Sequence, residues 1–481
     1  MPKRFPLSIL ILFVLLDLGY TFWQNYQLPL EGDLPQIVLP APDCRQVLGD
    51  PFGWAALTRH EVYVAPNRFF AHAAMVGYFK SVPFGLQKLG LSPVNSIYAA
   101  CALFNTLVQA LIMYVLGRYA SGTWRLSSRK LWVTMALLVP LFQVGGYHNQ
   151  MGIADNSITY TFFYAFPLLL LLLYFLPFYQ AEVDGRPFRV GPLTWLGLLG
   201  LMVVLSFNGA IVPGVVAVLS VGIGLRWLVQ QGPLLRQGRV AEVWRRIPWQ
   251  PFGLLLIFGL LCLYSLYIGT FEAEQLTHDL PLWERYQRLP LGLNDQFRRP
   301  GLPIFLGAVL LNLALIRWRT PATDAGRRLL RAGRWLGLFA LVFILLLPLG
   351  GYRNYRPLIL RRDSVLPILL ALMALYILTS YYLLRHLPAA QRRAYLAWVL
   401  VLSAFYTVSD HPWLVRTNAC ERQAFRTLAE SAGPVVRLPN DCTVMAWDLA
   451  TYPEASETPA QLLDYWGVTW GKRLYVQEPK P

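Results

Sequence analysis

The stretch ITYTFFYAFPLLLLLLYFLPF, residues 158–178, contains no charged side chain and consists mainly of Leu, Phe and Tyr. A helix of about 20 predominantly apolar residues is long enough to cross the hydrocarbon core of a bilayer. This stretch therefore predicts a membrane-crossing helix. Comparable stretches flank it on both sides, at 5–23, 94–117, 131–144, 193–207, 210–229, 251–271, 301–316, 335–349, 365–384 and 395–408.

The composition indicates the same class of protein. The chain has 481 residues, of which 56% are hydrophobic and 14% charged, whereas soluble domains carry about 25% charged residues. Residues 193–229 are too long for one crossing, and we divide them at Asn208-Gly209, a turn signal. Several stretches reach only about 15 residues, so a short one is alternatively re-entrant. We predict an all-α polytopic membrane protein with about 11 transmembrane helices.

The net charge of +16 is distributed unevenly along the chain. Alternate connectors, together with the N-terminus, hold about half of the 42 Lys and Arg residues but only four acids; these connectors are 118–130, 179–192, 230–250, 317–334 and 385–394. Short basic loops face the cytoplasm. We therefore expect a cytoplasmic N-terminus, an extracytoplasmic C-terminus and a location in a bacterial inner membrane. The basic excess reflects topology, and no nucleic-acid partner is expected.

Three polar segments fall on the extracytoplasmic side of this topology. The first, 24–93, contains two amphipathic stretches near 46–60 and 68–90, which suit helices lying in the membrane interface. The second is 272–300. The third, 409–481, contains short alternating runs and is predicted to form a small α/β-like appendage, separate from a transmembrane domain over 1–408. Residues 5–23 are interpreted as a retained helix and not a signal peptide, because they end without a small-residue cleavage site.

The five cysteines contribute to the assignment of the tail. Cys101 and Cys262 lie within expected spans, while Cys44, Cys420 and Cys442 lie on the outer side, where disulfides persist. Cys420 and Cys442 are the expected pair, and the cysteine spacing fits no metal site.

Acidic residues close to the first span are candidates for chemistry. In Glu31-Gly32-Asp33 the glycine allows a sharp turn that brings both carboxylates to one place. Such carboxylates act as a general base or bind a divalent cation. The alternative is a pair of solvated loop acids near the headgroups.

A second polar patch, which includes His148 and Asp155, joins the third and fourth spans. His148 is alternatively a hydrogen-bonded structural residue. Asp155 is alternatively a helix cap, because Asp and Asn are favoured at that position.

A third patch contains arginines on the outer side, against the positive-inside rule. It comprises Tyr352, Arg353, Tyr355, Arg356, Arg361 and Arg362. Guanidinium groups bind phosphate by two-point contacts, and neighbouring tyrosines stack or hydrogen-bond. The expected ligand is a lipid phosphate; the alternatives are anionic headgroup contacts and salt bridges to the outer acids.

With its first span, the early acid after it, the amphipathic stretches and the late outer arginines, the chain resembles the GT-C superfamily of membrane glycosyltransferases. The resemblance implies a polyprenyl-phosphate-linked sugar donor and a glycan, lipid or protein acceptor. It implies that Asp33 is the catalytic base, with Glu31 and Asp155 as further acids, and that Arg353 and Arg356 face the lipid phosphate. A divalent cation, Mg²⁺ or Mn²⁺, would lie at Asp33 and Asp155. The chain lacks the Asp-Asp or Asp-x-Asp pair that several members carry.

Other functions remain open at this point. A lipid or polysaccharide transporter would also use outer arginines, and so would a polysaccharide polymerase or ligase of the O-antigen type. A membrane scaffold whose tail binds a partner is a further alternative. Direct displacement by an enzyme would invert the anomeric configuration of the sugar.

Overall fold

A computed structural model describes residues 6–144, 151–274, 280–350, 352, 356–410 and 417–478. The protein is mainly helical, and within these residues its only sheet has two strands. Eight helical segments of the described chain are long and apolar enough to cross a membrane. They are α1 (Leu7–Tyr26), α7 (Pro93–Ser121), α9 with α10 (Ile158–Asp184), α12 (Ile211–Gln230), α15 with η4 (Trp249–Phe271), α18 (Gly301–Arg319), α19 with η5 (Asp324–Gly350) and α20 (Arg362–His386). These are the features of a multi-pass integral membrane protein.

The three other expected spans also coincide with helices. Residues 131–144 hold α8 (Arg129–Leu138) and η1 (Val139–Leu141), and residues 193–207 hold α11 (Pro192–Ser206); both are short. The third is α21 (Ala389–Ser409), which carries Arg392 and Arg393 near its N-terminus and is less apolar than the eight segments above. The expected division of 193–229 is present, because α11 ends at Ser206 and α12 begins at Ile211.

The helices pack as a bundle around α7 and α20. In the apolar stretch of each of these two helices 67% of residues are buried, against 11% in α19 at the periphery. α1 packs on α7, α18 and α19 pack on α20, and α12 packs on α15. Near its outer end, α10 is preceded by a π-helical turn, η3 (Thr161–Ala165). Such turns are frequently found at functional sites, and this one lies beside the residues described below.

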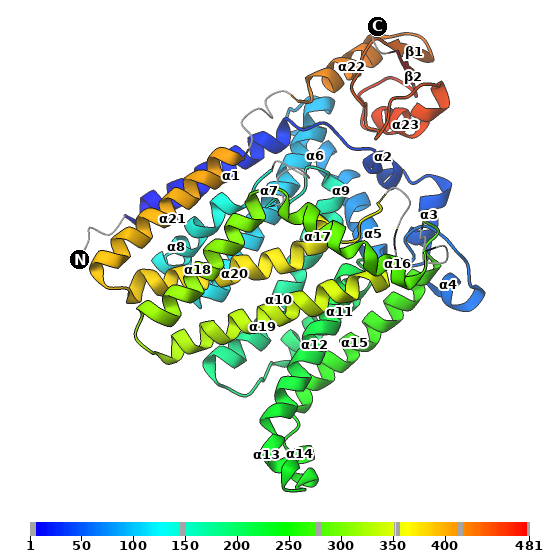
Figure 1. The fold of residues 1–481 in the computed structure, drawn as a ribbon. Coiled ribbons are helices and arrows are strands. Elements are labelled where there is room, and N and C mark those ends of the chain that lie inside the picture. The colour runs from blue at the N-terminus through cyan, green and yellow to red at the C-terminus, as the bar shows by residue number, and fades with distance from the viewer. Residues whose placement is uncertain are drawn as a thin grey trace.

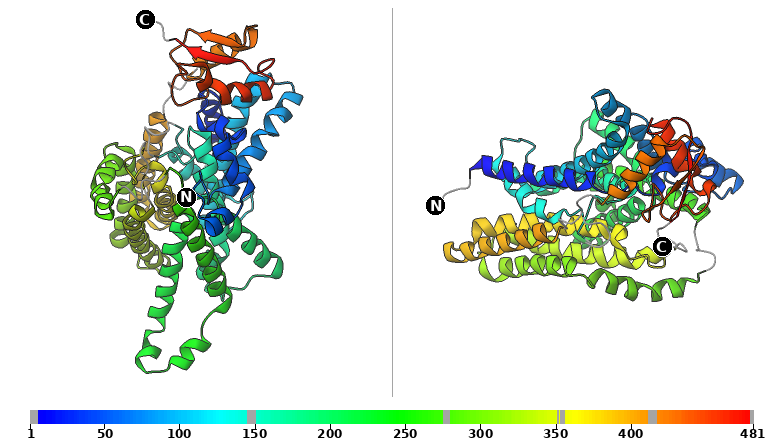
Figure 2. Two further views of the ribbon diagram at one scale, coloured as in Figure 1. Left: turned by 90° about the vertical axis from the view of Figure 1, so that its right-hand side faces the viewer. Right: turned by 90° about the horizontal axis from the view of Figure 1, so that it is seen from above.

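The basic connectors and the polar outer segments lie at opposite ends of the bundle. α13 (Gly232–Arg236) and α14 (Val240–Arg245) form a hairpin at the end opposite the C-terminal segment (Figures 1 and 2). Contacts join the connector 179–192 to its neighbours: Arg226, near the C-terminal end of α12, pairs with Glu182, and Arg328 donates to the carbonyl of Val183 at 3.2 Å. The end of the bundle that carries the polar segments is therefore distinct from the end that carries the basic connectors.

The first outer segment folds into five short helices. They are α2 (Asp33–Val38), α3 (Pro42–Gly49), α4 (Trp54–Arg59), α5 (Phe69–Phe79) and α6 (Val82–Lys88). α5 buries Ala71, Met75 and Phe79 against the bundle, so this helix packs on protein along one side. The second outer segment contains α16 (Leu282–Gln287) and α17 (Leu289–Phe297).

The C-terminal segment forms a small α/β unit on top of the first outer segment (Figure 1). It contains α22 (Ala419–Glu430), β1 (Val435–Leu438), η7 (Pro453–Ser456), α23 (Glu457–Tyr465) and β2 (Leu474–Gln477). The strands pair in parallel with Val435 opposite Leu474, an arrangement that requires a crossover connection, here including α23. The expected disulfide between Cys420 and Cys442 is confirmed, and Trp466 donates its indole N–H to the carbonyl of Phe79 at 3.1 Å.

Candidate functional site

Asp155 and Arg362 form a buried ion pair where α9 (Ile158–Tyr160) and α20 begin. Asp155 Oδ2 lies 2.8 Å from Nη1 of Arg362, and the two side chains are 6% and 4% exposed. Arg362 Nε also donates to the carbonyl of Gly152 at 3.0 Å, and Asp155 Oδ1 accepts from the N–H of Ser157 at 2.8 Å. Burial raises the pKa of the Asp155 carboxyl, and the Arg362 charge opposes that shift. The ion pair therefore holds both side chains in place.

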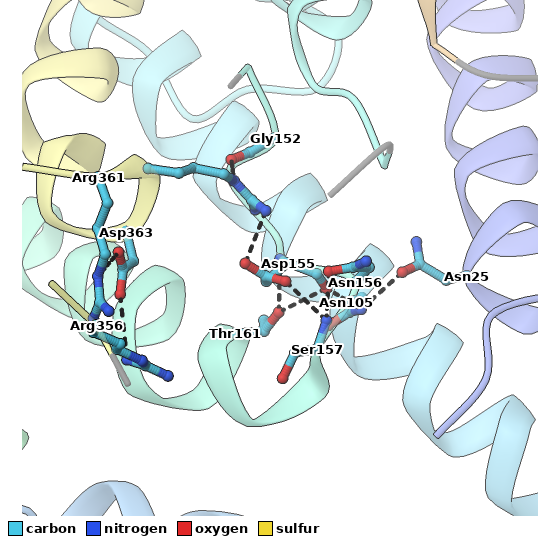
Figure 3. A network of polar contacts seen from close by, with 11 residues as sticks. Asn25, Asn105, Gly152, Asp155, Asn156, Ser157, Thr161, Arg356, Arg361 and Asp363 are labelled. Atoms are coloured by element: carbon cyan, nitrogen blue, oxygen red, sulfur yellow. Dashed lines mark hydrogen bonds and ion pairs between the residues drawn. The ribbon is translucent and has the colours of Figure 1, made fainter. Parts of the chain in front are cut away.

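The backbone of Asp155 connects this pair to the first two long helices. Asn105 on α7 donates to the Asp155 carbonyl at 2.9 Å and to Asn25 Oδ1 on α1 at 2.7 Å (Figure 3). Asp155 is not the cap of α9, because the N-cap residue is Ser157 and no side chain of the described residues accepts a capping hydrogen bond there; the Asp155 carboxylate instead accepts from the N–H of Ser157, one residue before the helix.

A second charged group lies beside the first, around Asp363 (Figure 3). Arg361 Nε is 2.6 Å from Asp363 Oδ1, and Arg356 Nη1 is 3.9 Å from Oδ2. The Arg356 guanidinium also lies over the ring of Tyr160, 4.8 Å from its centroid. Three of the arginines predicted to bind phosphate are thus brought together at the N-terminus of α20, although Arg362 points into the pair with Asp155.

The remaining predicted residues of this patch have different positions. Tyr352 is buried and donates its hydroxyl to the carbonyl of Arg285 at 2.7 Å, while Arg288 lies over its ring at 5.5 Å. Arg353, Tyr355 and His148 lie outside the described residues.

A cavity of about 760 Å³ opens between these arginines and the apolar helices α12, α15 and α19. Its polar end is lined by Arg68, Arg356, Arg361, Asp363 and Glu272, and Tyr352 and Tyr164 also border it. The other walls are apolar, with Ile211, Ala217, Leu263, Leu266, Phe343, Leu346, Leu347 and Leu349. The cavity thus has a charged end and an apolar body.

Arg68 is a cavity residue that sequence reasoning missed. It comes from the first outer segment, immediately before α5, and its guanidinium lies over the Phe163 ring at 5.8 Å. Its side chain runs along Gly209, where an added Cβ would lie 3.2 Å from Arg68 Nε. No carboxylate pairs with Arg68 in the described part of the chain. A lone arginine was the available signal, but Phe163 and Gly209, its neighbours in space, are 95 and 141 residues away in sequence.

The segment that carries Arg68 is anchored to the end of α15. The N–H of Tyr63 donates to the carbonyl of Phe271 at 3.2 Å, and the N–H of Ala65 donates to Glu272 Oε1 at 3.1 Å. Ala65 has φ of 60°, a left-handed conformation that costs energy for a residue other than glycine. Asn67 donates to the Ser265 carbonyl at 3.1 Å. These contacts fix the position from which Arg68 reaches the cavity.

Glu31 and Asp33 do not line this cavity. Glu31 is buried; its Oε1 accepts from both the N–H and the hydroxyl of Thr159, and its Oε2 accepts from the Asp33 N–H at 2.7 Å. Burial, and then the neighbouring Asp33 charge, raise the pKa of Glu31 to about 8. α9 contacts both groups, the early acids and the late arginines, because Thr159 binds Glu31 and the next residue, Tyr160, lies under the guanidinium of Arg356.

Asp33 has a partner from the far end of the chain. Trp447 Nε1 donates to Asp33 Oδ1 at 2.8 Å. Gly32 lies so close to Trp447 that an added Cβ would be 2.7 Å from its backbone nitrogen. Sequence reasoning gave no indication that the tail reaches the proposed base.

The tail is held there by Glu421, a buried acid beside the disulfide. Its Oε2 accepts from the Leu30 N–H at 2.9 Å and from the Tyr98 hydroxyl at 2.6 Å, and its Oε1 accepts from the Met445 N–H at 2.9 Å. Burial raises the pKa of Glu421 to about 7. One carboxylate therefore joins the outer segment, α7 and the tail.

The hypothesis of a cation at Asp33 and Asp155 can be compared with these contacts. Asp155 is paired with Arg362, and Asp33 is bonded to Trp447. Within the described residues, no group of three His, Cys, Asp or Glu side chains is arranged to hold a metal ion. Asp33 and Asp155 thus each have another partner, and the hypothesis of a cation there stays a prediction.

Comparisons with known proteins add no further constraint on this site. No protein-family model, no curated protein and no solved structure matches the chain.

Proposed function

We propose that this chain is a membrane glycosyltransferase of the GT-C type, which moves a sugar from a polyprenyl-phosphate-linked donor to an acceptor at the extracytoplasmic face. The observation that carries the proposal is the cavity with arginines at one end and apolar helices around the rest. A polyprenyl phosphate has the same division, with an anionic head on a hydrocarbon chain. The volume of about 760 Å³ falls in the range of about 300–1,000 Å³ typical of ligand pockets.

The charges at the polar end favour an anion. The lining contains three arginines, Arg68, Arg356 and Arg361, and two carboxylates, those of Asp363 and Glu272. Arg68 has no carboxylate partner within the described residues, so it is the cation most available to a phosphate. Charge-assisted contacts from guanidinium to phosphate are short and strong. They would stabilise the negative charge that develops on the departing phosphate.

The early acids supply the second half of the chemistry. Glu31 is held by Thr159 and by the backbone of its own turn, and thereby fixes the turn that carries Asp33. In the proposed step the acceptor hydroxyl oxygen bonds to the anomeric carbon while the bond from that carbon to the phosphate oxygen breaks. The hydroxyl proton passes to Asp33, and polyprenyl phosphate leaves with its electron pair. One such displacement inverts the anomeric configuration.

The proposed topology has eleven crossings, with the N-terminus in the cytoplasm, the C-terminus outside and the protein in a bacterial inner membrane. The separation of basic connectors from polar segments supports it, because short basic loops stay cytoplasmic. The disulfide of the tail supports an outer position, since disulfides persist in oxidising compartments.

The proposal is tested with the full-length protein in lipid nanodiscs. Polyprenyl-phosphate-linked pentoses and hexoses are supplied together with candidate glycan, lipid and peptide acceptors, and sugar transfer is measured. We expect transfer that Asp33→Asn lowers by about 10²–10⁴-fold and that Arg356→Ala also reduces. Arg59→Ala, an exposed arginine of the same outer segment, is the matched control and should have no effect.

Two results would argue against an enzyme. Transfer that is unchanged in Asp33→Asn protein removes the proposed base. Products unchanged in every variant, together with blocked movement of a lipid across the bilayer, would favour a transporter.

A further inference from the structure

Trp447 is an exposed residue that contacts Asp33, the proposed catalytic base. This side chain is 51% exposed, although its indole N–H is bonded to Asp33 Oδ1 at 2.8 Å. A tryptophan that is exposed on a small unit normally turns its polar N–H to water. Here the N–H is bonded to Asp33, and about half of the residue nevertheless remains exposed.

Asp33 is the second residue of this contact. Its Oδ1 accepts from Trp447, whereas its Oδ2 has no hydrogen-bond partner among the described residues. The Asp33 side chain is partly buried. Gly32 allows the turn to lie against the tail, because any side chain there would collide with Trp447. A half-exposed indole is therefore bonded to a carboxylate whose second oxygen accepts no hydrogen bond from the part of the chain that the structure describes.

We infer that Trp447 and Asp33 form the acceptor subsite and that the acceptor is a carbohydrate. This inference rests on the proposed function. A sugar ring presents a face of C–H groups to the electron-rich face of an indole, and its edge carries hydroxyl groups that donate to a carboxylate. Stacking on Trp447 positions one acceptor hydroxyl at Asp33 Oδ2, where its proton is removed.

The surroundings favour a carbohydrate over the other acceptor classes. Asp448, which follows Trp447 in the chain, is exposed, so a second acidic residue adjoins Trp447 besides Asp33. A hydrocarbon chain placed there would desolvate these charged groups without compensation. A sugar satisfies them with its hydroxyls and covers only the ring.

Contacts through α9 connect the subsite to the proposed phosphate site. Asp33 is connected through Glu31 and Thr159 to α9, and Arg356 contacts Tyr160 of the same short helix. An acceptor on Trp447 would therefore approach α9 from the tail and from the turn that carries Asp33. A phosphate at Arg68 and Arg356 would approach α9 from other elements, including the start of α20. Direct displacement needs the entering and leaving oxygens on opposite sides of the anomeric carbon.

Binding is measured by saturation-transfer difference NMR on the full-length protein in nanodiscs, without any donor. The probes are neutral oligosaccharides built from gluco-, galacto-, manno- and arabino-configured sugars. We expect at least one to bind, and Trp447→Ala to weaken its affinity about tenfold. Trp447→Phe keeps an aromatic face and should retain most of the binding. Trp470→Ala, which removes a 90% exposed tryptophan of the same segment, should change nothing.

Several results would overturn the inference. One is the absence of Trp447-dependent binding for every sugar tested, and another is an equal loss in Trp470→Ala. Transfer to a peptide or a lipid but to no glycan would also overturn it while leaving the proposed function intact. Conversely, Trp447-dependent glycan binding without any transfer would remove the proposed function and leave the sugar subsite standing.

Discussion

Asp155 and Arg362 are separated by more than two hundred residues in the chain, yet their side chains meet at 2.8 Å in a buried ion pair. The pair joins the turn before α9 to the first turn of α20, and both neighbouring groups depend on it. On one side the Asp155 backbone is bonded to Asn105; on the other, Arg361 and Asp363 are the two chain neighbours of Arg362. The pair therefore sets the position of the arginines relative to the early acids.

Breaking this pair should destabilise the protein strongly. Arg362→Met leaves Asp155 buried without its cation, and loss of one partner of a buried pair costs about 3–5 kcal/mol. We expect a clearly lower melting temperature in detergent. Arg437→Ala removes an arginine from an exposed pair with Glu478, and should leave the melting temperature unchanged. Equal melting of Arg362→Met and the wild type would contradict the structural role of the pair.

Removal of Arg68 should weaken the binding of a lipid phosphate. A hydrogen bond to a charged group contributes about 1.5–3 kcal/mol, so Arg68→Ala should raise the Kd for polyprenyl phosphate by roughly ten- to a hundredfold. Arg68→Lys keeps the charge but loses the two-point contact, and should lie between. The measurement is equilibrium binding in nanodiscs, with Arg59→Ala as control; an unaffected Kd in Arg68→Ala would place the phosphate elsewhere.

Stability should fall as the pH rises through the range set by Glu421. Burial raises the pKa of this carboxyl from 4.5 to about 7, so the folded protein holds a proton that the unfolded chain has already released. The stabilising contribution is complete below pH 4.5 and is lost as the pH rises to about 7. Glu31, whose pKa is raised to about 8, acts in the same direction.

The test compares melting temperatures between pH 5 and pH 8, roughly the window of both groups, for wild type and Glu421→Gln. We expect the variant to show a smaller decline with pH, because its side chain cannot ionise. An identical slope in the two proteins would mean that Glu421 is ionised in the folded state throughout.

Gly32 should not tolerate a side chain. In Gly32→Ala the new Cβ would lie 2.7 Å from Trp447, so the tail or the turn must shift and the bond to Asp33 is disturbed. We expect reduced Trp447-dependent glycan binding and reduced transfer. Gly49→Ala is the control in the same outer segment, since nothing lies within 4 Å of its added Cβ. Normal binding and transfer in Gly32→Ala would show that the Trp447 contact is dispensable.

The class of the protein could be recognised from the residues in order. Membrane-crossing helices are local features, because each needs only a sufficient run of apolar side chains, and stretches such as 158–178 and 365–384 coincide with long helices. The division at Asn208-Gly209 and the pairing of Cys420 with Cys442 were also accessible, the first from a turn signal and the second from the expected sidedness. The number of crossings was less accessible, since 131–144 and 193–207 form helices too short to be assigned by length.

The composition of the candidate site was accessible only in part. Asp155, Arg356 and Arg361 were singled out as polar residues in unexpected places, but nothing in their spacing shows that Arg362 is committed to Asp155. The contributions of Arg68 and Trp447 depend on contacts between distant segments, and Trp447 lies 414 positions from Asp33. Hydrophobic runs follow from neighbouring residues, whereas a site assembled from several chain segments depends on how the helices pack.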